Sequence, residues 1–172
     1  MSQDDAIARL AKQIDASRKA ERLLVNEQNV ADLRRRGAGE LHEICAAFVA
    51  SVNRTLSLSP VELSPPAFTA QMFRDSDVNL IRIGSQGREL QIAFQSTAQS
   101  FSTDKFLVPY VLEGEVRTFN QKMLDRFEIR NQSLFYCVNE ESSGWRFYDW
   151  RYARSAPLDP QLLATLMEPL FR

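Results

Sequence analysis

Apolar residues near the start of the chain recur at the three- and four-residue spacing of an α-helix. The stripe that they form comprises Ile7, Leu10, Ile14 and Leu24. Three arginines, residues 34–36, precede Gly37, and cations on a last turn followed by glycine indicate a helix end. We therefore expect a first helix from about Gln3 to Arg36 and a second from about Gly39 to Thr55. The intervening residues 37–39 form either a turn or a weak joint in one long rod.

The first of these helices is long for the chain that carries it. About 34 helical residues span about 51 Å, whereas a compact chain of this size has a diameter of about 40 Å. Its apolar stripe is also narrow, which is typical of a coiled-coil-like pairing of two helices rather than of burial in a core. We expect this helix to dock on another chain or on a second copy of itself. The alternative is an intramolecular hairpin with the second helix.

After these helices the spacing of apolar residues changes to the period of two that is typical of strands. Residues 78–83 and 90–94 flank Ser85-Gln86-Gly87, which predicts a hairpin. Further strands are expected at 106–112, 116–119, 127–129, 133–138 and 145–154, with a turn at Glu113-Gly114. Asp159 and Pro160 then begin a closing helix.

This order of elements predicts an α+β fold: N-terminal helices, an antiparallel meander sheet of about five or six strands packed by helices on one face, and a C-terminal helix. Residues 1–56 form the helical segment. Residues 57–77, which are rich in serine and proline, form a linker with a short helix, and residues 78–172 form the sheet with its closing helix.

Composition indicates a folded protein with no strong electrostatic preference. Of the 172 residues, 44% are hydrophobic and 25% charged, and the formal net charge of −1 argues against a general nucleic-acid binder. The polar start lacks a signal segment, and no apolar run is long enough to span a bilayer. Cys45 and Cys137 each lie in an apolar run and are expected to be buried free thiols. We expect a cytoplasmic protein that does not associate with membranes.

Residues that could carry catalysis are scarce. The one histidine, His42, has Ala46 where a zinc-protease helix carries its second histidine, and no glycine-rich phosphate-binding motif occurs. The paired carboxylates Glu113 and Glu115 flank a predicted turn, where acids are usually solvated. We therefore assign no catalytic, cofactor-binding or metal-binding residue. The sequence favours a protein that is not an enzyme, without deciding the question.

The densest aromatic stretch is residues 145–154. If it forms one strand, one of its faces carries Arg146, Tyr148, Trp150, Tyr152 and Arg154. Aromatic residues bracketed by arginines are enriched in protein interfaces, and also on surfaces that stack nucleic-acid bases. The other interpretation is that the strand buries its aromatic residues under helices.

The function favoured by the sequence is that of a non-enzymatic protein-interaction module, an adaptor or a small subunit of a cytoplasmic assembly, which self-associates through its N-terminal helix. An alternative is a small-ligand-binding or catalytic roll with an apolar pocket between sheet and helices. That pocket would be lined by Leu90, Ile92, Phe94, Phe106, Val108 and Tyr110, with polar help from Arg82, Arg117 or Tyr148. Single-stranded nucleic-acid binding through the aromatic and arginine face is the least favoured, because of the net charge.

Overall fold

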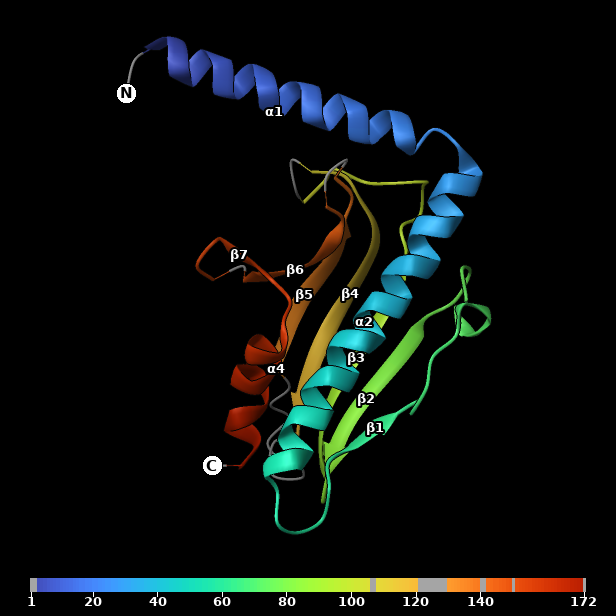
Figure 1. The fold of residues 1–172 in the computed structure, drawn as a ribbon, viewed down its shortest axis with the longest axis vertical. Helices are drawn as coiled ribbons and strands as arrows, with labels where there is room; N and C mark the ends of the chain where they lie inside the picture. Colours follow the sequence, from blue (N-terminus) through green and yellow to red (C-terminus); the bar gives the residue numbers. More distant parts are fainter. Residues whose placement is uncertain (1–2, 106–107, 121–129, 140–141, 150, 172) are drawn as a thin grey trace.

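The computed structural model describes residues 3–105, 108–120, 130–139, 142–149 and 151–171 (Figure 1). Two helices, α1 (Gln3–Leu23) and α2 (Glu27–Thr55), come first, and helix α4 (Pro160–Met167) and the 3₁₀ turn η2 (Glu168–Phe171) come last. Between them lie β1 (Glu62–Ser64), the 3₁₀ turn η1 (Ala70–Met72), β2 (Asn79–Ser85), β3 (Arg88–Ser96), β4 (Tyr110–Phe119), β5 (Arg130–Cys137), β6 (Gly144–Asp149) and β7 (Arg154–Pro157). The α+β class is confirmed, with seven strands in the described residues where the sequence predicts five or six.

Each strand pairs antiparallel with the next in sequence, so the sheet is a meander in the order β1 to β7. The predicted hairpin is β2–β3, joined by Gln86 and Gly87 with φ angles of 51° and 78°. Strand β1 comes from the segment expected to be a linker, and pairs with β2. The short helix expected there is only the single 3₁₀ turn η1.

The break between the two N-terminal helices lies at residues 24–26, and the predicted helix end at Gly37 is wrong. Asn26 caps α2, because its Oδ1 accepts hydrogen bonds from the backbone amides of Gln28 at 2.9 Å and Asn29 at 3.3 Å. The helix then continues without interruption through residues 37–39. An asparagine cap that directly follows three apolar residues, 23–25, therefore marks the boundary that the arginines and Gly37 were expected to mark.

Gly37 lies where α2 approaches the sheet most closely. A Cβ atom on this residue would lie 2.7 Å from Cδ1 of Tyr136, which is shorter than any tolerable carbon contact. Nε1 of Trp145 donates a 2.7 Å hydrogen bond to the carbonyl of Gly37. The glycine is thus required by tertiary packing rather than by helix termination.

Helices α2 and α4 cover one face of the sheet and contact each other (Figure 1). The core between them and the sheet contains a row of residues in register across four strands, Phe94, Gly114, Leu134 and Phe147. Gly114 lies inside β4, so the turn predicted at Glu113-Gly114 is wrong. A Cβ there would lie 2.5 Å from the carbonyl oxygen of Ala93, and the glycine lets β3 and β4 pack closely.

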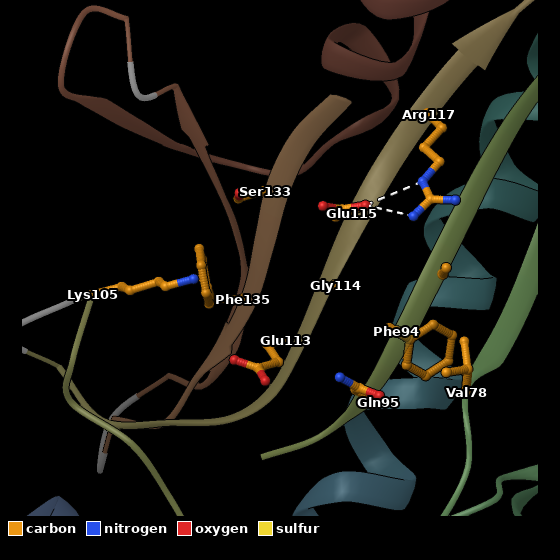
Figure 2. Close-up of a pocket in the computed structure, with 11 residues that line it drawn as sticks. Val78, Phe94, Gln95, Lys105, Glu113, Gly114, Glu115, Arg117, Ser133 and Phe135 are labelled. Carbon is orange, nitrogen blue, oxygen red and sulfur yellow. Dashed lines mark hydrogen bonds and ion pairs between the residues drawn. The ribbon is translucent and has the colours of Figure 1, made fainter. Parts of the chain in front are cut away.

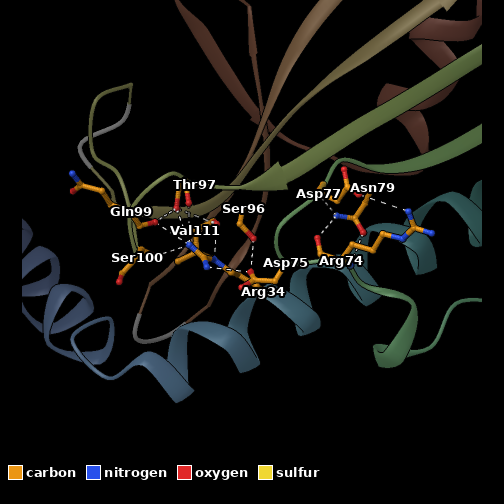
Figure 3. Close-up of polar contacts among 10 residues, drawn as sticks. All are labelled: Arg34, Arg74, Asp75, Asp77, Asn79, Ser96, Thr97, Gln99, Ser100 and Val111. Carbon is orange, nitrogen blue, oxygen red and sulfur yellow. Dashed lines mark hydrogen bonds and ion pairs between the residues drawn. The ribbon is translucent and has the colours of Figure 1, made fainter.

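Arg34 joins α2 to the loop after β3 and to β4 (Figure 3). Its Nη2 donates to the carbonyls of Thr97 and Gln99, and its Nε donates to the carbonyl of Val111 at 3.2 Å. Its Nη1 lies 3.2 Å from Oδ1 of Asp75, and the arginine side chain is only 11% exposed. The planar guanidinium therefore holds three segments together.

Replacing Arg34 with lysine should lower the free energy of unfolding by about 1–2 kcal/mol, because an ammonium cannot reach all these acceptors at once. Chemical denaturation monitored by circular dichroism measures the change. The matched control is Arg35→Lys, since the Arg35 side chain is 48% exposed and, within the described residues, forms its ion pair with Asp32 on the same helix. That control should change stability by less than about 0.5 kcal/mol, and equal losses in both variants would contradict the assignment.

Candidate interaction surface on the N-terminal helix

Helix α1 extends across one end of the sheet and is attached to the rest of the chain near its own C-terminus (Figure 1). Ala20 is its only buried residue among those described, and Leu24, just beyond the helix, is 1% exposed. The 21 residues of α1 span about 31 Å. Most of this length therefore has no contact with the core.

The apolar stripe predicted on this helix is divided by the structure. Ile7, Leu10 and Ile14 are 61%, 56% and 42% exposed, respectively. Leu24, in contrast, packs in the core, because the chain turns at residues 24–26. We call the three exposed residues the α1 stripe. Exposed large apolar side chains gathered on one helical face are typical of an interaction surface.

An apolar groove of about 430 Å³ lies between α1 and the end of the sheet. Its helix wall includes Leu10, Ile14, Ala16 and Ala20, and its other wall includes Val108, Pro109 and Val138. The polar residues that line it are Gln13, Ser17 and Asn139. The second wall is held by the backbone, since the amide of Val138 donates a 2.8 Å hydrogen bond to the carbonyl of Pro109. We call this the α1 groove. It continues the apolar surface of the α1 stripe onto the sheet.

The aromatic segment does not form the single strand that the sequence predicts. Strand β6 ends at Asp149, residues 151–153 are in a turn, and β7 begins at Arg154. Arg146 and Tyr148 share one face of β6, whereas Tyr152 is 70% exposed in the turn. Trp150 lies outside the described residues.

Arg154, the second arginine of the predicted Arg/Tyr/Trp face, also departs from the prediction. Arg154 pairs with Asp149, whose side of the sheet alternates with that of Tyr148. Of the described members of the predicted Arg/Tyr/Trp face, only Arg146 and Tyr148 therefore share a face of the sheet, while Arg154 lies on the other face and Tyr152 in the turn. The buried aromatic residues of β6 are instead Trp145 and Phe147, which point to the helices.

A second hollow, of about 300 Å³, lies on the face of the sheet that α2 and α4 leave open (Figure 2). Glu113 and Glu115 share its floor on β4, rather than flanking a hairpin turn as predicted. Arg117 donates to Oε2 of Glu115 at 2.9 and 3.1 Å, and Nζ of Lys105 lies 5.6 Å from the ring centre of Phe135. The two carboxylates and the two cations that line this hollow sum to no net charge, so the hollow has no strong preference for a charged ligand.

The two thiols and the one histidine that the sequence analysis considered are all buried. Burial raises the pKa of Cys45 to about 12, and burial also raises the pKa of Cys137 to about 12, whereas reactive thiols have a lowered pKa. The ring of His42 is buried, stacks on Phe68, and lies 2.8 Å through Nε2 from the carbonyl oxygen of Pro65. In the described part of the chain, no three histidine, cysteine or acidic residues are grouped as metal ligands.

The pocket of the alternative hypothesis is not assembled as expected. Leu90, Ile92 and Phe94 are packed in the core, while Tyr110 lies on the other face against Phe135. Val108 belongs to the α1 groove, and Phe106 is outside the described residues. Residues that sequence analysis grouped by strand period are thus divided between three places.

Sequence reasoning missed the second wall of the α1 groove. Pro109 was the available signal, because a proline at the start of a strand marks a place where pairing is irregular. The register between β4 and β5 does shift there, between Tyr110 and Leu112.

Comparison of the chain with protein-family models, with curated proteins and with solved structures finds no match in any of the three. Within the described residues, no helix combines the length and the apolar character that crossing a bilayer demands.

Proposed function

We propose that this chain is a non-enzymatic interaction module of a cytoplasmic assembly, and that it self-associates through the α1 stripe. The observation that carries the proposal is the exposure of Ile7, Leu10 and Ile14 on one face of a helix that has a single buried residue in its described length. Buried free thiols at Cys45 and Cys137 support a reducing compartment.

The total accessible surface supports a partner of considerable size. The chain exposes 11217 Å², whereas a compact monomer of 19.7 kDa exposes about 8,600 Å². The excess of about 2,600 Å² is similar to the area that each chain buries in a large obligate dimer, roughly 1,000–2,500 Å². A second copy packed along α1 would cover part of this excess.

The test is the molar mass of the full chain, measured by light scattering after size exclusion over a range of concentrations. The unsubstituted chain should form a dimer. Leu10→Glu and Ile14→Glu should each raise the dimer dissociation constant at least about tenfold, because a charge would enter an apolar contact.

The matched control is Ala8→Glu, which adds the same charge about 130° around the helix from the α1 stripe. This variant should dimerise as the unsubstituted chain does. Circular dichroism should show all three variants folded, since each substituted side chain is exposed. A chain that is monomeric at every concentration, or a dimer insensitive to both stripe variants, would overturn the proposal.

A further inference from the structure

We infer that the two copies pair with their α1 helices antiparallel, so that Asp4 of each copy lies beside Arg18 of the other. This inference rests on the proposed self-association and specifies its geometry. It follows from the angular positions of charges on α1 and from the way the helix is attached to the body.

The first step is the arrangement of side chains around α1. At 100° per residue, Ile7, Leu10 and Ile14 fall within an arc of about 60°. Asp4 and Arg18 both flank one side of this arc, at about 90° and 50° from its centre. Ala20 lies about 110° away on the other side, where it is buried against the body. The helix therefore has one charged flank that faces outward and one flank that faces the body.

The second step is symmetry. A twofold axis that relates two antiparallel helices brings each flank against the same flank of its partner, whereas a parallel pair brings opposite flanks together. The charged flank has Asp4 at its N-terminal end and Arg18 and Arg22 near its C-terminal end, and all three are exposed. Asp15 lies farther from the stripe on the same side, at about 110° from the centre of the arc. In an antiparallel pair the charged flank is thus complementary to itself. In a parallel pair it would face the other flank, which carries Gln13 and Ala20 and offers no matching charge there.

The third step is register. Placing Ile7 opposite Ile14 of the partner, and Leu10 beside Leu10 of the partner, brings all six stripe residues into contact. The same register sets Asp4 within about 1.5 Å of Arg18 of the partner along the helix axis. Apolar contact and charge pairing therefore select one alignment.

The attachment of α1 favours the same orientation. Each body is fixed to its helix at the C-terminal end, through Ala20 and Leu24. Antiparallel helices place these attachment points at opposite ends of the pair. Parallel helices would bring both bodies to the same end.

Chemical cross-linking tests the orientation in the full chain. The double variant Asp4→Cys/Arg18→Cys and the two single variants are treated with a bis-maleimide linker about 15 Å long. In the antiparallel pair the two substituted positions of different copies adjoin, whereas position 4 of one copy lies about 20 Å along the axis from position 4 of the other. Positions 4 and 18 of one chain are about 21 Å apart, which excludes an intrachain product.

We expect the double variant to be cross-linked into dimers and both single variants to remain uncross-linked. Lys12→Cys, on the far side of α1, is the control for random collision and should also remain uncross-linked. A dimer in which Asp4→Cys alone is cross-linked, or in which the double variant is not, overturns the antiparallel arrangement and leaves the proposed self-association intact. The absence of any dimer by light scattering overturns the proposed function itself, so the two failures are distinguishable.

Discussion

Gly37→Ala should destabilise the protein by about 1–3 kcal/mol, while the same substitution two residues later should stabilise it. At Gly37 the added methyl group would lie 2.7–2.9 Å from three ring atoms of Tyr136. That ring cannot retreat, because it is fully buried and packs on Trp145 with ring centres 5.5 Å apart. The indole would also lose the alignment of its hydrogen bond to the carbonyl of residue 37.

Gly39→Ala is the matched control, since no atom outside the local helix lies within 4 Å of its added Cβ. Alanine there should raise the free energy of unfolding by about 0.5–1 kcal/mol, because it restricts the unfolded chain and favours the helix. Urea denaturation of both variants measures the two changes. A stabilised Gly37→Ala variant would show that α2 does not contact Tyr136 as described.

At alkaline pH the protein should lose stability steeply, by about 1.4 kcal/mol per pH unit for each buried thiol. Burial raises the pKa of both Cys45 and Cys137 from 9.0 to about 12. Between these values the unfolded chain binds fewer protons than the folded one, so the free energy of unfolding falls as pH rises. The stability that the two protonated thiols contribute is complete below pH 9.0 and is lost progressively towards pH 12. At pH 11 the loss in the free energy of unfolding amounts to about 5 kcal/mol for the two thiols together.

Urea denaturation at a series of pH values above 9 measures this slope. Burial also raises the pKa of Tyr136, and the nearby negative charge of Glu40 raises it further, so the tyrosine adds to the same trend. The Cys137→Ala variant is the comparison, and it should be less stable at neutral pH. Its free energy of unfolding should fall less steeply with pH, because one buried thiol no longer contributes. A stability that is constant from pH 9 to pH 11 would mean that these thiols are accessible to solvent.

Local patterns were sufficient for the parts of the fold that depend on neighbouring residues. The β2–β3 hairpin and the cap at Asp159 both follow from short sequences whose hydrogen bonds close within a few residues. Gly37 and Gly114 could not be interpreted in this way. Each is demanded by a group distant in sequence, Tyr136 and the carbonyl of Ala93, and nothing in the local sequence distinguishes such a glycine from one that ends a helix or forms a turn.

The turn between β6 and β7 was missed for a related reason. It contains neither glycine nor proline, and Ala153 adopts a φ of 50° that a non-glycine residue seldom shows. Aromatic residues that continue through Tyr152, inside the turn, maintained the alternation of a single strand in the sequence. The predicted Arg/Tyr/Trp surface therefore depended on a continuity that the backbone does not have.

For the candidate interaction surface, periodicity identified Ile7, Leu10 and Ile14 because exposure on an overhanging helix is decided by length and spacing. Periodicity could not show that Leu24 is buried while these three residues are exposed, since the burial of Leu24 depends on the break at residues 24–26. The second wall of the α1 groove, to which Val108 and Val138 belong, depends on which strand ends lie beside α1. The position of the strand ends is a property of the assembled sheet and cannot be predicted from local periodicity.

The meander has a consequence for how the chain reaches its native state. Because every strand pairs with its neighbour in sequence, the sheet can grow hairpin by hairpin with small losses of loop entropy. Contacts between α2 and β6 are different: the bond from Trp145 to Gly37 spans 108 positions. We therefore expect the strands to assemble early and α2 to dock late, so that the apolar face of the nascent sheet is open to other chains during synthesis until its helix closes over it.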